Sequence, residues 1–186
     1  MKQQLNKWGK SPQAWEILWG DFFRLEIAKA EDVLQAALEI KALIKSIEVA
    51  TEVNLDVRMA IGVGEKTFSG ERISESNGEA FVMGGEKFEK LKKEKIMLGI
   101  QTRREDFDQD VNLFLKLASL FMDKWTVSSA KLIGLVLENP KITQEEIGQI
   151  LGIKQNSVNG RWNRANVDET LIVKQVFRKK ILKLIK

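Results

Sequence analysis

The segment from Thr143 to Ala165 constrains the fold more than any other part of the chain, because it carries start and turn signals for two short helices. Thr143 is a helix-capping residue type, and Glu146, three positions later, completes the spacing of a capping box. Gly152 is the residue type that a tight turn after a helix requires. The spacing predicts two short helices that meet at Gly152, as in a helix-turn-helix.

Apolar positions predict that these two helices share one core. Ile147, Ile150 and Leu151 form an apolar stripe on the first helix, and Val158 and Trp162 seat the second helix on the same core. Small Gly148 lets the second helix approach closely. Six polar or basic residues are candidates for the outward surface of the second helix: Lys154, Gln155, Asn156, Asn159, Asn163 and Arg164.

These outward residue types suit a DNA groove. Asparagine and glutamine pair with adenine, while lysine and arginine bind guanine or phosphate. We therefore predict that the helix beginning near Lys154 binds double-stranded DNA. The alternative is a helical hairpin that only packs, and Gly160 inside the second helix argues for that alternative, because glycine costs about 1 kcal/mol of helix propensity relative to alanine.

Positive charge is concentrated at the C-terminal end. Residues 143–186 hold nine basic and four acidic side chains, whereas residues 1–104 hold 17 and 16. The last stretch, VDETLIVKQVFRKKILKLIK, is amphipathic and contains Lys179. We expect this stretch either to pack as a helix with a solvated face or to bind phosphates or a second subunit.

The N-terminal part alternates between strand and helix signals. The expected elements, in order, are a hairpin at 14–27 around Gly20-Asp21, a helix at about 30–48, a strand at 55–63, a loop at 64–78, a helix at 79–95 interrupted by Gly84 and Gly85, and a strand at 96–102. This order predicts an α+β domain, with an antiparallel or mixed sheet covered by two helices.

From Asp106 onward the pattern is entirely helical. Apolar residues from Phe107 to Trp125 mark one helix, and those from Ala130 to Leu137 mark another, which ends at Asn139-Pro140. We therefore place a domain boundary near Arg104. The expected units are residues 1–104 and an all-α domain at 105–186, with the helix-turn-helix at about 143–165.

Composition excludes several classes of function. The chain has no cysteine and no histidine, which removes disulfides, thiolate or imidazole metal sites and the commonest general base. No apolar stretch approaches the length of a membrane span, and the N-terminus lacks the apolar core of a signal peptide. We expect a cytoplasmic protein with no membrane partner and no cofactor.

The blocks WGDFFRLEI, DVRMAIGVGEKTFSGERISESNGEAF and TQEEIGQILGIKQNSVNGRWNRA together resemble the SatD family of bacterial proteins over nearly the whole chain. More distantly, the N-terminal pattern is similar to the ferredoxin-like sheet of class III nucleotidyl cyclases. That similarity makes Asp21 a weak candidate metal ligand, since cyclases carry a metal-binding Asp in a Gly-Asp hairpin. A hairpin-turn role is the alternative for Asp21.

The rest of the cyclase chemistry does not carry over. Cyclases place an Asn and an Arg on the helix after the loop, and Val82 and Glu86 stand at those positions here. The first, central strand of the cyclase sheet also lacks a counterpart. The resemblance therefore implies either that the native chain extends upstream or that a partner strand fills the gap in a dimer.

Together these features predict a DNA-binding transcriptional regulator with a non-catalytic, cyclase-like N-terminal domain for sensing or dimerisation. The expected partners are double-stranded DNA, a second copy of the chain, and a small-molecule or nucleotide effector. The alternative functions are a nucleotide-binding or nucleotide-converting enzyme that uses Asp21 and a metal ion, and a scaffold whose helix-turn-helix binds protein.

Overall fold

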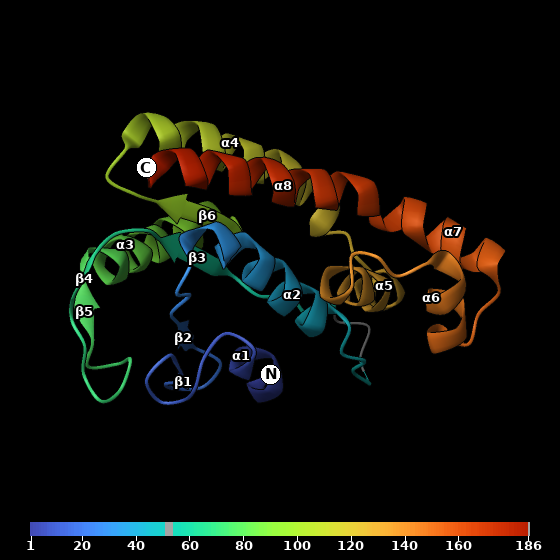
Figure 1. Ribbon diagram of the computed structural model, residues 1–186, viewed down its shortest axis with the longest axis horizontal. Helices are drawn as coiled ribbons and strands as arrows, with labels where there is room; N and C mark the ends of the chain where they lie inside the picture. Colours follow the sequence, from blue (N-terminus) through green and yellow to red (C-terminus); the bar gives the residue numbers. More distant parts are fainter. Residues whose placement is uncertain (51–53, 186) are drawn as a thin grey trace.

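The computed structural model describes residues 1–50 and 54–185 as an α+β chain (Figure 1). The helices, in chain order, are α1 (Lys2–Asn6), the 3-10 turn η1 (Ala30–Asp32), α2 (Val33–Lys45), α3 (Glu79–Glu94), α4 (Glu105–Met122), α5 (Val127–Glu138), α6 (Gln144–Leu151), α7 (Gln155–Ala165) and α8 (Val167–Leu184). The strands are β1 (Trp15–Ile17), β2 (Phe23–Leu25), β3 (Met59–Gly62), β4 (Lys66–Phe68), β5 (Asn77–Gly78) and β6 (Leu98–Gln101).

The N-terminal hairpin and the helix after it are confirmed. β1 and β2 pair antiparallel, with Trp15 opposite Leu25. Gly20, in the turn between them, has φ +58, a left-handed conformation that glycine adopts without steric cost. The helix expected at about 30–48 is present as η1 followed directly by α2.

β3 and β6 form a parallel ribbon in which Ile61 lies opposite Ile100. A side chain of α4 occupies the outer edge of β6: Asn112 Oδ1 accepts a hydrogen bond from Ile100 N at 2.9 Å, and its Nδ2 donates to Ile100 O at 2.9 Å. A side-chain amide thus satisfies backbone groups that a neighbouring strand would otherwise pair with.

The strands do not join into the single ferredoxin-like sheet that the sequence led us to expect. In the described part of the chain they form three separate two-stranded sheets, β1–β2, β3–β6 and β4–β5. β4 and β5 lie within residues 64–78, which we expected to be a loop only. The cyclase resemblance implies a further, central strand between the hairpin and β3. The hairpin and β3 belong to different sheets here, and the implied strand stays a prediction.

α3 runs without a break through both of its glycines, so the interruption expected at Gly84 and Gly85 was wrong. Gly84 lies against Gly62 of β3, and a Cβ added to Gly62 would lie only 2.0 Å from Ala80 O. Close approach of two backbones therefore explains this pair of facing glycines. Packing of α3 on β3 offsets the low helix propensity of glycine.

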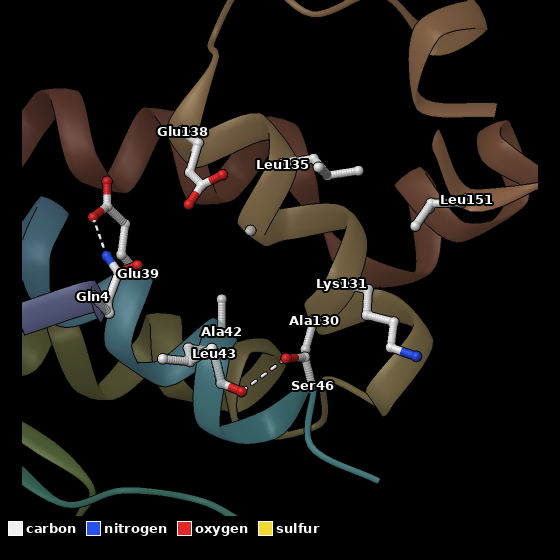
Figure 2. Close-up of a pocket in the computed structure, with 11 residues that line it drawn as sticks. Gln4, Glu39, Ala42, Leu43, Ser46, Ala130, Lys131, Leu135, Glu138 and Leu151 are labelled. Atoms are coloured by element: carbon white, nitrogen blue, oxygen red, sulfur yellow. Dashed lines mark hydrogen bonds between the residues drawn. The ribbon is translucent and has the colours of Figure 1, made fainter. Parts of the chain in front are cut away.

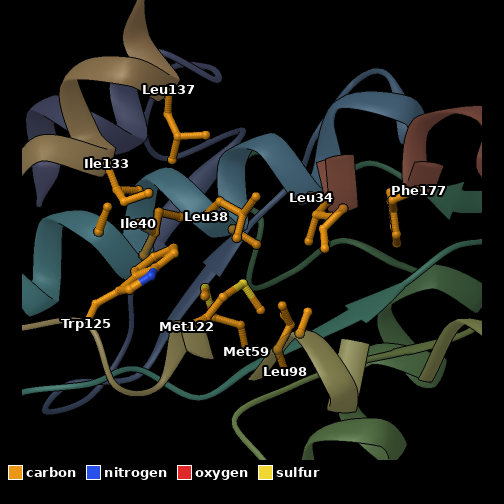
Figure 3. Packing of buried hydrophobic residues seen from close by; sticks show 14 of the residues in the cluster. Leu34, Leu38, Ile40, Met59, Leu98, Met122, Trp125, Ile133, Leu137 and Phe177 are labelled. Carbon is orange, nitrogen blue, oxygen red and sulfur yellow. The ribbon is translucent and has the colours of Figure 1, made fainter. Parts of the chain in front are cut away.

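One hydrophobic cluster extends from α1 to α8 (Figure 3). It continues across residue 104, because α4 packs against β6 and α5 packs against α2. The expected domain boundary near Arg104 stays a prediction, and the core on its two sides is shared. Buried members labelled in Figure 3 are Leu34, Leu38, Ile40, Met59, Leu98, Met122, Trp125, Ile133, Leu137 and Phe177.

Trp125 lies in the connection between α4 and α5, so its expected place at the end of a helix was wrong. α4 stops at Met122, and the Trp125 side chain turns into the core, where it is fully buried. Its Nε1 donates a hydrogen bond to Ala165 O at 2.9 Å. This bond joins the connection to the last residue of α7.

Two lysines of α2 are buried among carboxylates. Lys41 Nζ lies 2.7 Å from Asp56 Oδ1 and 2.7 Å from Asp123 Oδ1. Lys45 Nζ lies 3.2 Å from Asp56 Oδ2 and donates to Asp123 O at 2.9 Å. Since an unpaired buried ammonium group would cost several kcal/mol, these contacts hold α2, the segment before β3 and the end of α4 together.

Among the helices of residues 1–50 and 54–185, the structure contains none with the length and apolar character that crossing a membrane requires.

Replacing Lys41 with methionine should lower the free energy of unfolding by about 3 kcal/mol, because it leaves Asp56 and Asp123 partly unpaired near the core. Urea unfolding followed by tryptophan fluorescence measures this loss. Lys93→Met, at an exposed position of α3, is the matched control and should change the free energy by less than about 0.5 kcal/mol. Equal effects of the two substitutions would contradict a structural role for the buried pair.

Candidate nucleic-acid interface

α5 packs against α7, the second helix of the C-terminal pair. Thr126 caps its first turn by accepting a hydrogen bond from Ser129 N, and the helix ends at Asn139, directly before Pro140, as expected. α5 packs against both α2 and α7. The position of α7 therefore depends on the core of the whole chain.

The capping box at the start of α6 is confirmed. Glu146 N donates to Thr143 Oγ1 at 3.2 Å, and Thr143 N donates to Glu146 Oε2 at 2.7 Å. The backbone and side-chain hydrogen bonds from Thr143 hold the pKa of the Glu146 carboxyl below its ordinary value. Both bonds satisfy donors that the first turn of a helix would otherwise leave free.

The turn between α6 and α7 is built as the sequence predicts. Gly152 has φ +63, and Ile153 N donates to Gly148 O at 2.9 Å. A Cβ added to Gly148 would lie 2.9 Å from Ile153 O and 3.5 Å from Val158 Cγ2. The small residue therefore lets the start of α7 lie directly against α6, as expected. Ile147 is buried, but Ile150 is 59% exposed, so its expected place in the shared core was wrong.

α7 rests on the core through one face. Val158 and Ala165 are fully buried, and Trp162 is half-buried. Gly160 does not interrupt the helix. The hydrogen bond from Trp125 Nε1 to Ala165 O fixes the C-terminal end of α7 against the α4–α5 connection.

The opposite face of α7 is polar and carries no acidic side chain. Helical spacing places Asn156, Asn159 and Asn163 along this face, about 160°, 100° and 140° around the axis from buried Val158. Gln155 shares a side with Asn159 and lies nearer to the buried face. All six α7-region candidates named from the sequence are exposed: Lys154, Gln155, Asn156, Asn159, Asn163 and Arg164.

Asn166 separates α7 from α8. It has φ +51, a left-handed conformation that asparagine tolerates better than most residues, and its carbonyl accepts from the buried Thr170 hydroxyl at 2.8 Å. This joint ends the polar face of α7 and redirects the chain into α8.

The basic side chains of α8 have different surroundings. Arg178 forms an ion pair with Asp32 and lies 3.6 Å from Glu31, and Lys180 lies 3.7 Å from Asp110. Lys179 is exposed, but it lies twelve residues, about 18 Å, along α8 from Val167. The structure therefore does not bring Lys179 beside the polar face of α7.

Asp21 lies exposed in the turn of the β1–β2 hairpin. Within the described residues there is no group of three or more acidic side chains placed to hold a metal ion. At the two positions compared with cyclases, Val82 is exposed and Glu86 accepts a hydrogen bond from Gln101 Nε2 at 2.6 Å. Neither residue offers an amide or guanidinium group for a nucleotide.

An open groove of about 270 Å³ lies between α2 and α5 (Figure 2). Glu39 of α2 and Ser46, directly after α2, line one side, while Lys131 and Glu138 line it from α5. Leu151 of α6 also lines it, so this groove touches α2, α5 and α6.

Trp125 and Asn166 are the two positioning residues that sequence reasoning missed. Trp125 directly precedes Thr126, the N-cap of α5. A residue before a helix cap lies in the connection that leads to the helix, and this signal could have placed Trp125 there. Asn166 follows the last apolar residue of α7, where asparagine is a common helix-ending residue. Ser157, also exposed on α7, was not singled out.

No protein-family model, curated protein or solved structure matches this chain.

Two glycine substitutions should change stability in opposite directions. Gly148→Ala should destabilise the protein, because the new methyl group meets the Ile153 carbonyl at 2.9 Å. Gly160→Ala should stabilise it by about 0.5–1 kcal/mol, because the nearest atom, 3.3 Å away, belongs to the flexible Arg164 side chain. Thermal unfolding by circular dichroism measures both. Stabilisation by Gly148→Ala would mean that α6 and α7 do not approach as described.

Proposed function

We propose that this protein is a DNA-binding transcriptional regulator in which α6 and α7 form the helix-turn-helix and α7 enters the major groove. The observation that carries the proposal is the outer face of α7, an exposed row of asparagines without a carboxylate on a helix held by its opposite face. A helix that only packed would gain nothing from this selection of amides.

The residue types of α7 suit two kinds of contact with DNA, to bases and to phosphates. Asparagine and glutamine amides can pair with the N6 and N7 edge of adenine, so Asn156 and Asn159 suit base contacts. Lys154 and Arg164, near the two ends of α7, suit phosphates, which fix orientation and carry no sequence information. The N-terminus of α7 adds its helix dipole to the attraction for phosphate.

Gly160 supports this proposal, although its helix propensity argued against it in the sequence. Helical spacing puts Gly160 on the outer face, between Asn156 and Asn163. The absence of a side chain there allows the helix backbone to come close to a base pair. The same substitution that stabilises α7, Gly160→Ala, should therefore weaken DNA binding.

The N-terminal part suits sensing better than catalysis. We propose that it is a non-catalytic, cyclase-like, SatD-type domain in a cytoplasmic regulator, and that a small-molecule or nucleotide effector binds the groove between α2 and α5. A ligand there would contact α5 and Leu151 of α6 together, and would bias the position of the helix-turn-helix.

Selection from random duplex DNA, followed by binding measurements on the preferred site and on random DNA, tests the proposal. Asn156→Ala, Asn159→Ala and Gln155→Ala should lose about 1–3 kcal/mol on the preferred site and much less on random DNA. Arg164→Ala should weaken both alike and lower the salt slope by about one unit.

Two lysines serve as comparisons for Arg164→Ala. Lys92→Ala, on the exposed side of α3, should leave binding unchanged. Lys179→Ala should lose as much DNA affinity as Arg164→Ala only if the bound DNA extends along α8. Equal loss on specific and random DNA for the amide variants would show that the reading face lies elsewhere, and no binding at low salt by the intact chain would reject the regulator.

The purified chain should not cyclise or hydrolyse ATP or GTP in the presence of Mg²⁺ or Mn²⁺. A single exposed carboxylate is a poor holder of a metal pair, and Val82 and Glu86 cannot stabilise a transferring phosphoryl group. Chromatographic analysis of nucleotide products measures this. Metal-dependent turnover that Asp21→Ala abolishes would contradict the prediction and favour the enzyme.

A further inference from the structure

α4 is apolar on two opposite faces. Its inner face carries four buried side chains, Val111, Leu115, Ala118 and Met122. Its outer face carries three exposed leucines, Leu113 at 60%, Leu117 at 56% and Leu120 at 64% exposure, which we name the outer leucine stripe. The two rows are offset by two residues, or about 200° around the helix, so the stripe points away from the core.

The stripe lies on an outer side of the molecule. α4 packs inward against β6 and sideways against α8, and Figure 1 shows the two helices lying next to each other along one border of the molecule. A surface helix usually keeps polar side chains on the face away from the core. Three leucines at spacings of four and three residues on that face indicate a second packing partner.

Charges of opposite sign flank the stripe. Asp110 precedes Leu113 by three residues, so it lies on the same side of α4 as the leucines. Lys124 follows Leu120 by four residues and lies in the turn directly after α4, which ends at Met122. Asp110 is 74% exposed, and its carboxylate has only a distant ion pair, 3.7 Å from Lys180 Nζ. Lys124 is exposed.

The order of an acidic residue, three leucines and a basic residue is complementary to the same order in a second, antiparallel copy. Two copies of α4 laid antiparallel about a two-fold axis near Leu117 would place Leu113 of each copy beside Leu120 of the other. The same register would bring Asp110 of each copy to Lys124 of the other. Such self-complementarity is what an isologous, two-fold interface requires, whereas an unrelated partner would not need acid and base at matched distances from the centre.

α8 carries a further exposed apolar residue, Ile172. α4 and α8 are antiparallel neighbours joined at Asp110 and Lys180. Ile172, which is 58% exposed, lies eight residues before Lys180, and Ala118 lies eight residues after Asp110, so Ile172 is level with the C-terminal half of the stripe.

We propose that the outer leucine stripe of α4 binds the same stripe of a second copy of the chain in an antiparallel, two-fold dimer. The occupant is the protein itself, and the charges at the two ends set the register. The inference stands independently of DNA binding. The contact of one helix pair falls at the small end of stable interfaces, so the dimer should form at micromolar concentrations.

Sedimentation velocity without DNA, from about 1 to about 100 µM, tests the proposal. The intact chain should shift from monomer to dimer over this range. Leu117→Asp should weaken self-association by at least about a hundredfold, because it places two carboxylates together at the apolar centre. Val82→Asp, at a similarly exposed apolar position on α3, is the control and should leave the dimer unchanged. Circular dichroism checks that each variant is folded.

A charge exchange tests the register. Lys124→Glu alone should weaken the dimer by about tenfold or more, since the new carboxylate of each copy then faces Asp110 of the other. Adding Asp110→Lys should restore most of the affinity. An intact chain that stays monomeric at about 100 µM, a dimer that Leu117→Asp leaves intact, or a double variant no stronger than Lys124→Glu alone would each overturn the proposal.

Discussion

The two buried lysines of α2 are the constraint on which the arrangement of the molecule depends. Lys41 and Lys45 cannot lie in the core as unpaired cations, and their partners come from distant parts of the chain, Asp56 before β3 and Asp123 after α4. Satisfying both ammonium groups therefore positions three segments together. Hydrophobic burial could tolerate small shifts of these segments, whereas charge-assisted hydrogen bonds require short distances between particular atoms.

Trp125 connects these ion-paired segments to the C-terminal helices. The residue follows Asp123 by two positions, its ring fills the core, and its Nε1 holds the Ala165 carbonyl at the end of α7. The capping box and the Gly152 turn shape α6 and α7 locally, while Trp125 and α5 place them relative to the rest. α6 and α7 consequently share their core with the N-terminal part, and the groove between α2 and α5 includes Leu151 of α6.

The exposed faces of α8, α7 and α4 differ in their charged, polar and apolar groups. Arg178 and Lys180 of α8 form ion pairs within the chain, so the basic C-terminal end is less available to phosphate than its composition suggests. The face of α7 keeps its amides and basic groups exposed. On α4, leucines remain exposed between an aspartate and a lysine. Each of these helices thus has one face toward the core and a second, exposed face of different chemical character.

The sequence by itself determined the features that depend on a few neighbouring residues. Thr143 with Glu146, Gly152, Gly20 and the start of α2 could be recognised because capping and turns are short-range chemistry, and helical spacing alone predicted the exposure of Asn156 and Asn159. Tertiary structure decided the rest. Gly84 was expected to break a helix but instead packs against Gly62, and Trp125 was expected to extend one but its ring enters the core. The described strands form separate ribbons, and a side chain, Asn112, occupies one edge of β6. These outcomes depend on contacts between residues distant in the sequence, such as Gly62 with Gly84 and Trp125 with Ala165, and local periodicity holds no information about such contacts.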